Sequence, residues 1–180
     1  GGIVGSNFGQ ACTSANTCVI EDCTNDIKIN GDRAGGICGA YCAKKHNSIN
    51  GHLEIKNCSN TGEITSSTQT RSGICGDFYC FGGGTLTIEG CSNTADINST
   101  YGGGILGSGY NAGNDNNIKN RIVTITNCYN TGDIVGNYSG GITGNLFCVG
   151  TNSTGTIEAC YNEGEVYAFG SGGIAGSAFK

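Results

Sequence analysis

The chain has 180 residues and a net charge of −5; 34 residues are glycine and only 13% are charged. An acidic chain without a basic stripe is not expected to bind nucleic acid. No apolar run approaches the roughly 20 residues needed to cross a bilayer, so membrane insertion is not expected either.

The cysteine content points to an oxidising compartment. Twelve cysteines are many for 180 residues of a protein kept in a reducing environment. The chain begins without a methionine and without a signal peptide, which suggests a processed chain or an excised fragment. We expect an extracellular or cell-surface protein. Its glycosylation candidates, each in an Asn-x-Ser/Thr sequon, are Asn57, Asn98, Asn137 and Asn152.

Two sequence signals recur along the chain and are clearest between Thr124 and Gly144. The first is I-x-x-C-x-N-x-G-x-I and the second is G-G-I-x-G. Their period is about 34 residues, with single intervals of about 31 to 37, and such self-similarity is typical of stacked repeats. We therefore treat residues 1–180 as one repeat domain. The isoleucines of the second signal are Ile3, Ile37, Ile74, Ile105, Ile142 and Ile174.

Each copy of the first signal predicts two short strands with one buried face. A β-branched residue stands three positions before each cysteine and another stands six positions after it. The upstream positions are Ile20, Ile55, Ile88, Ile125 and Ile157. Two residues after each cysteine stands an asparagine, and this column predicts a ladder of side-chain amides at a bend. The ladder consists of Asn25, Asn60, Asn93, Asn130 and Asn162.

The second signal predicts a further strand whose isoleucine points inward. A rougher aromatic column follows it, and a variable arm then leads to the next cysteine. The arm at residues 111–117, N-A-G-N-D-N-N, is expected to be a surface loop. The aromatic column contains Phe8, Tyr79, Tyr110, Phe147 and Phe179, with Cys42 at the same place in one copy.

These columns predict an all-β fold, a parallel β-solenoid (β-helix) of about five coils. Adjacent coils would stack about 4.8 Å apart, and a right-handed winding is the default for parallel crossovers. Helical repeats are disfavoured because no 3.6-residue periodicity appears and glycine is abundant. A β-propeller is disfavoured because each repeat would need four strands.

The pairing of I-x-N-C-Y-N-T-G-x-I with G-G-I-x-G resembles the GLUG repeats of large bacterial surface proteins. The resemblance covers nearly the whole chain and is closest at residues 125–144. It implies a noncatalytic extracellular repeat region of the kind found in adhesin-like proteins and beside the catalytic domain of some secreted peptidases. The chain departs from the pattern in its preference for isoleucine over leucine in the glycine signal, and in its additional cysteines.

The twelve cysteines divide into two groups with different expected roles. Five repeat once per coil and are expected to be buried, inert thiols, because a straight ladder does not converge on a zinc ion. This core cysteine ladder is Cys23, Cys58, Cys91, Cys128 and Cys160. Among the others, disulfides are predicted for the pairs Cys38–Cys75, Cys42–Cys80 and Cys12–Cys18, while Cys148 has no obvious partner.

No catalytic, metal or cofactor site is expected. The two histidines, His46 and His52, belong to no recognisable metal or nucleophile motif. The acidic column Glu63, Asp96, Asp133 and Glu165 offers a calcium ion few oxygens, so a solvated face is the preferred interpretation. Polysaccharide cleavage is supported only by analogy with other β-solenoids, and the outward residues do not form the threonine array of an ice-binding face.

Two functional hypotheses remain. In the first, the chain is a structural subunit of a cell-surface filament or stalk, and its partners are copies of itself stacked through the solenoid ends. In the second, it is an adhesin repeat region that binds glycans or a host surface. Tyr129 and Tyr161 are the stacked aromatic pair expected for such a surface.

Overall fold

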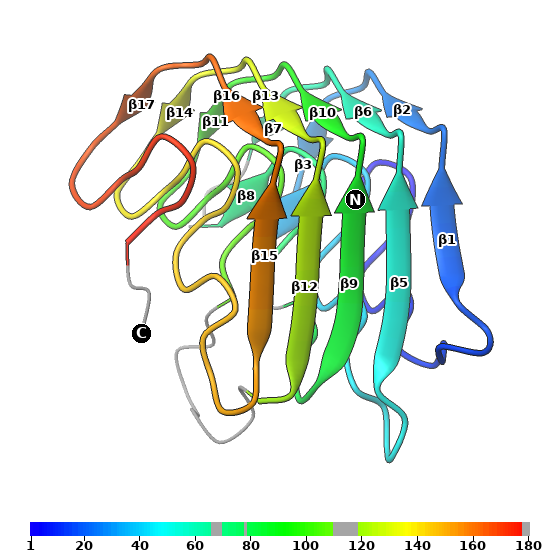
Figure 1. The fold of residues 1–180 in the computed structure, drawn as a ribbon. Coiled ribbons are helices and arrows are strands. Elements are labelled where there is room, and N and C mark those ends of the chain that lie inside the picture. The colour runs from blue at the N-terminus through cyan, green and yellow to red at the C-terminus, as the bar shows by residue number, and fades with distance from the viewer. Residues whose placement is uncertain (66–69, 78, 110–118, 178–180) are drawn as a thin grey trace.

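The computed structural model describes residues 1–65, 70–77, 79–109 and 119–177. The described chain is an all-β parallel solenoid of about four coils without a helix (Figure 1), which confirms the predicted fold class. Every strand pair is parallel and every partner comes from a neighbouring coil.

The longest strands form one five-stranded sheet in the order β1-β5-β9-β12-β15 (Figure 1). Along each strand, side chains alternate between the core and the outer face, and the inward positions of β5 are Gly51, Leu53 and Ile55. Alternation is the pattern of a sheet with one buried face. The five strands are β1 (Cys18–Glu21), β5 (Gly51–Lys56), β9 (Gly84–Glu89), β12 (Arg121–Thr126) and β15 (Thr154–Glu158).

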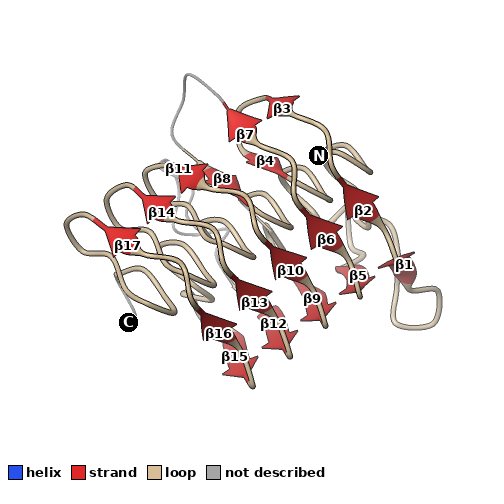
Figure 2. Cartoon of the chain, turned by 90° about the horizontal axis from the view of Figure 1, so that it is seen from above, coloured by secondary structure: helices blue, strands red, loops and turns tan. Residues whose placement is uncertain are grey.

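Two-residue strands follow the long strand in each coil and stack beside it (Figure 2). The second sheet contains β2 (Thr24–Asn25), β6 (Ser59–Asn60), β10 (Ser92–Asn93), β13 (Tyr129–Asn130) and β16 (Tyr161–Asn162). The next layer is divided into β3 (Ile29–Asn30) with β7 (Ile64–Thr65), and β11 (Ile97–Asn98) with β14 (Ile134–Val135) and β17 (Val166–Tyr167). A further pair is β4 (Ala34–Gly35) with β8 (Arg71–Ser72).

The glycine signal forms another stacked layer through single parallel bridges. Its residues pair in the order Val4, Cys38, Cys75, Leu106, Thr143 and Ala175. The isoleucine that precedes each of the four inner residues of this layer is buried in the core. Ile37, Ile74, Ile105 and Ile142 are all 0% exposed.

The observed register matches the sequence columns residue for residue. Ile20 pairs with Ile55, Ile55 with Ile88, Ile88 with Ile125, and Ile125 with Ile157. A one-residue slip would turn every inward side chain outward, so this register is strongly specified by burial. Two members of the aromatic column, Tyr110 and Phe179, and the arm at residues 111–117 lie outside the described residues.

The asparagines form a continuous hydrogen-bonded ladder through the solenoid. Each Nδ2 donates to the Oδ1 of the next coil, at 2.7 Å for Asn25 to Asn60 and 2.8 Å for Asn60 to Asn93. The Asn93–Asn130 and Asn130–Asn162 bonds are 2.7 Å long. The same Nδ2 also donates to a carbonyl two residues further along its own chain.

The second signal supplies the glycines against which this ladder packs. A Cβ on Gly73 would lie 2.4 Å from the Asn93 side chain, and one on Gly104 would lie 2.5 Å from that of Asn130. Neither distance is possible for real atoms, so the ladder requires glycine here. The two sequence signals therefore meet across the core of each coil.

We predict that Asn93→Ala lowers the free energy of unfolding by about 2–4 kcal/mol. Asn93 is 0% exposed, and its removal leaves Asn130 Oδ1 and the Ala95 carbonyl without their donors. Chemical denaturation measures the change. Asn30→Ala, at an exposed position of β3, is the control and should change the free energy by less than about 0.5 kcal/mol.

Candidate functional site

The cysteine ladder runs beside the asparagine ladder. The thiol of each inner or last ladder cysteine has its nearer acceptor in its own coil, the carbonyl two residues earlier, at 3.1–3.3 Å. An isoleucine carbonyl of the preceding coil lies at 3.6 or 3.7 Å from the same sulfur in Cys58, Cys91, Cys128 and Cys160. The sulfurs of Cys91, Cys128 and Cys160 each accept the backbone N–H of the ladder cysteine one coil before, at 3.4 Å. The ladder cysteines are free thiols.

The pKa values of these thiols are shifted in different directions along the ladder. Hydrogen bonds with Cys128 and Cys58, together with burial, raise the pKa of Cys91. Burial also raises the pKa of Cys160 in the last coil. At Cys58 and Cys128 the hydrogen bond with Cys91 acts in the opposite direction and lowers the pKa, to about 7 for Cys58. Cys58, Cys91 and Cys128 are nonetheless buried, so this part of the ladder acts as core packing.

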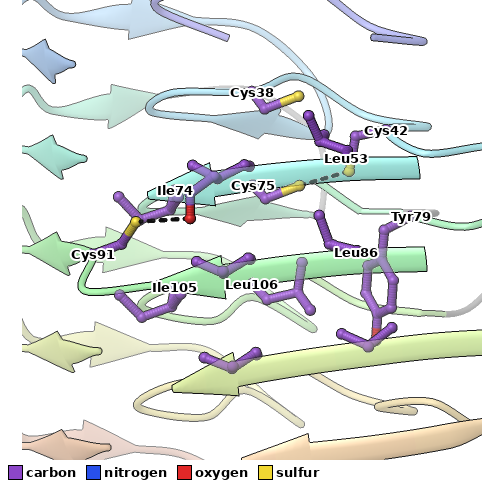
Figure 3. Close-up of a cluster of buried hydrophobic side chains, with 14 of the residues drawn as sticks. Cys38, Cys42, Leu53, Ile74, Cys75, Tyr79, Leu86, Cys91, Ile105 and Leu106 are labelled. Atoms are coloured by element: carbon purple, nitrogen blue, oxygen red, sulfur yellow. Dashed lines mark hydrogen bonds between the residues drawn. The ribbon is translucent and has the colours of Figure 1, made fainter. Parts of the chain in front are cut away.

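Three of the remaining cysteines come together in the core. The sulfurs of Cys38, Cys42 and Cys75 all lie within 4.8 Å of one another, and all three side chains are 0% exposed (Figure 3). Cys42 Sγ and Cys75 Sγ are 2.7 Å apart. Burial raises the pKa of both of these thiols well above its usual value.

The predicted disulfides have different outcomes. Cys12 and Cys18 are bridged, with their Cα atoms 5.7 Å apart. Cys38, Cys75, Cys42 and Cys80 are free thiols in the structure, so neither the Cys38–Cys75 nor the Cys42–Cys80 pair is bridged. Cys148 is half-buried, and its thiol donates to the Thr154 carbonyl at 2.9 Å.

The physical reason concerns side-chain direction. Cys38 and Cys75 are a parallel in-register pair, and such side chains point the same way with a separation of about 4.8 Å. A disulfide needs Cβ atoms only about 3.8 Å apart and directed toward each other. Register alone therefore overestimated the chance of a bridge.

The acidic column has a structural role that the sequence analysis missed. Asp96 Oδ1 accepts the backbone N–H of Asp133, and Asp133 Oδ1 accepts that of Glu165, both at 2.9 Å. Glu63 pairs with Lys28 at 3.0 Å on the exposed face. At least two of these carboxylates thus hold neighbouring coils together. The recurrence of an acidic residue at the same position of successive coils was the sequence signal for this role.

Two buried charged residues were also missed, because each occurs in one coil and forms no column. Arg121 is 0% exposed; its Nη1 donates to the Gly109 carbonyl at 2.8 Å, and its guanidinium lies 5.6 Å from the Tyr79 ring centroid. Asp77 is 2% exposed and lies 3.9 Å from Arg33 Nε. Burial raises the pKa of Asp77 to about 7, while Thr70 and Arg33 act in the opposite direction.

The outer surface carries the sequons and several aromatic rings. Asn57, Asn98, Asn137 and Asn152 are all exposed. Tyr129 and Tyr161 stack with centroids 5.2 Å apart and an interplanar angle of 6°. A second group consists of Tyr101 stacked on Tyr138 at 5.5 Å, and Phe169 edge-on to Tyr138 at 5.6 Å.

The two histidines lie near the outer surface. His46 is exposed at a turn, where its backbone pairs with Ile49. His52 Nε2 on β5 is 3.9 Å from Glu54 Oε1, which belongs to a carboxylate already paired with Lys56. Within the described part of the chain, no helix is long and apolar enough to span a bilayer.

The fold and these ladders define the chain as a parallel β-solenoid. No protein-family model matches the chain, and no curated protein or solved structure matches it either. The resemblance to GLUG repeats accordingly supports only a proposal.

We predict that Asp77 makes stability depend on pH. A folded-state pKa of about 7, above the usual value near 3.9, means that folding favours the protonated form. The contribution of Asp77 to the free energy of unfolding is fully present below about pH 4. It is lost as the pH rises through 7, and the free energy of unfolding falls by up to about 4 kcal/mol. Denaturant unfolding at several pH values measures this slope.

Asp77→Asn should remove most of that slope, since the amide does not titrate. Asp26→Asn, at an exposed position, is the matched control and should keep it. An unchanged slope in the Asp77 variant would show that other groups produce the pH dependence.

Proposed function

We propose that this chain is a noncatalytic structural protein, a solenoid unit of an extracellular or cell-surface filament or stalk that assembles head to tail. The observation that carries the proposal is the complementarity of the two end coils. Ile3 and Ile174 are 42% and 37% exposed, whereas four inner members of the same column are fully buried. Each end therefore offers the apolar contact that an inner coil already makes with its neighbour.

The hydrogen-bond ladders have a direction that favours head-to-tail stacking. Asn162 Nδ2 uses one hydrogen for the Gly164 carbonyl, and in every inner coil the second hydrogen goes to the next asparagine. Asn25 Oδ1 occupies the accepting position at the opposite end. Gly2 packs on Asn25 just as Gly141 packs on Asn162, and the segment around Gly173 already lies one level beyond Asn162. A second copy would therefore have to displace this terminal segment before its Asn25 could accept the hydrogen of Asn162. Such a head-to-tail contact is heterologous and extends into an open fibre.

The outer surface supports the extracellular setting. The asparagines of the four sequons are exposed, so they are accessible for glycosylation. The Cys12–Cys18 disulfide belongs in an oxidising compartment. The likeness of the repeats to GLUG repeats of surface proteins agrees with both observations.

We expect the purified chain to form rods at high concentration, and Ile174→Lys to prevent this. A lysine would place a desolvated charge in the stacking contact, which should weaken association at least about 30-fold. Sedimentation velocity and electron microscopy measure rod formation by the wild type and the variant. Ile122→Lys, on the outer face of β12, is the control because Ile122 is also exposed but lies away from the stacking faces.

Wild-type chain that stays monomeric at millimolar concentration would contradict the filament proposal. Equal effects of the two lysine variants would also contradict it, because they would locate the contact on the side of the solenoid. Circular dichroism of each variant establishes that the coils remain folded.

An adhesive function is the second candidate, and the exposed aromatic rings favour it. Phe169 is 74% exposed and adjoins the Tyr138 ring. In the Tyr129–Tyr161 pair each ring covers a face of the other, so that pair offers less open ring surface. A flat apolar ring beside polar groups is suited to a sugar face.

If the chain binds glycans, Phe169→Ala should weaken binding by about tenfold on a glycan array. Val135→Ala, at an exposed aliphatic position of β14, is the control and should leave binding unchanged. An array without any retained sugar would remove the adhesive candidate.

A further inference from the structure

The three buried cysteines of the core cluster come from two neighbouring coils. Cys38 and Cys75 occupy the same position of the glycine-signal layer, and Cys42 lies in the turn that follows Cys38. Figure 3 shows the Cys42 and Cys75 sulfurs directed toward each other. This approach links the first full coil to the second.

The geometry favours a bond between Cys42 and Cys75. Their sulfurs are 2.7 Å apart, so a disulfide bond of about 2.05 Å requires a further approach of only about 0.7 Å. The side chains of the in-register Cys38–Cys75 pair are parallel, so their sulfurs point the same way and not toward each other. Cys42 avoids this constraint because it approaches from the turn and not from the same rung.

A metal ion is the alternative use of three clustered thiols, and the structure argues against it. Zinc–sulfur bonds of about 2.3 Å in a tetrahedron place the sulfurs about 3.8 Å apart, farther than the observed 2.7 Å. Zinc also needs a fourth ligand, whereas the group found among the described residues supplies three. Three thiolates around a divalent ion would leave a net negative charge at a fully buried site, which is costly.

We propose that Cys42 and Cys75 form a disulfide that staples the first two coils together, and that Cys38 stays a thiol beside it. In the reaction each thiol loses a proton, and the pair transfers two electrons to an external low-molecular-weight disulfide, which leaves as two thiols. The three side chains are 0% exposed in the folded chain. The exchange therefore takes place while the coils are still closing.

The test is oxidative refolding of the reduced full chain in a glutathione redox buffer containing a chelator. Free thiols are then alkylated in denaturant, and the chain is cleaved with chymotrypsin without reductant. Cleavage after Tyr41 separates Cys38 from Cys42, and cleavage after Tyr79 separates Cys75 from Cys80. Mass spectrometry should find the Cys42 peptide joined to the Cys75 peptide, and Cys38 alkylated.

Three variants make the assignment specific. Cys42→Ser and Cys75→Ser should abolish the linked peptide, whereas Cys80→Ser, a buried cysteine outside the cluster, should keep it. In the wild type, added reductant should lower the thermal midpoint by about 5–10 °C, because the staple closes a loop with a sequence separation of 33. The Cys42→Ser variant should lose this part of the response.

Other results would overturn the proposal. A Cys38–Cys75 or Cys42–Cys80 linkage would show that the bond lies elsewhere, and alkylation of all three cluster cysteines would show that none forms. Refolding with zinc in place of the chelator tests whether the three thiols bind a metal ion instead. One retained zinc per chain, lost in Cys38→Ser, would identify the cluster as a metal site.

Discussion

The structure depends on the buried asparagine ladder. Each asparagine amide donates one hydrogen bond to a carbonyl of its own coil and another to the asparagine of the next coil. An inner coil therefore needs both neighbours for a complete set of hydrogen-bond partners. Because an unpaired polar group in the core costs about 1–3 kcal/mol, the ladder forces one repeat of each signal per coil at one register. Gly73 and its counterparts are a consequence, since only glycine leaves room for the amides.

The asparagine ladder fixes how the coils stack, but it does not fix the number of residues in each coil. The pairing from Asn60 to Asn93 spans 33 residues and that from Asn93 to Asn130 spans 37, yet the two hydrogen bonds have nearly the same length. In the sequence, the extra residues fall between Leu106 and Arg121, before β12. Variable loops on a fixed stack are the usual behaviour of repeat proteins, because each coil is held by its neighbours and not by its own length.

The same distinction explains what the sequence predicts and what it does not. The isoleucine and asparagine columns were predictable because a residue that repeats every coil must face the same environment every time. The buried Arg121 and Asp77 were not, since each occurs once and its burial depends on local packing. The cysteine pairs were predictable only in part. Cys12 and Cys18 are bridged as predicted, whereas register gives only the Cα spacing of Cys38 and Cys75, and the turn geometry shows where the Cys42 sulfur points.

The stability of the solenoid is therefore unequal along its length. In a stack of nearest-neighbour interactions, an end coil has one interface where an inner coil has two. The first coil carries the Cys12–Cys18 bridge and the cluster of Cys38 and Cys42. Among the described residues, the cysteines of the last coil are free thiols, and its strand β15 is largely exposed. If copies of the chain stack head to tail as proposed, a further coil placed on β15 would stabilise the chain where it has the fewest stacking partners.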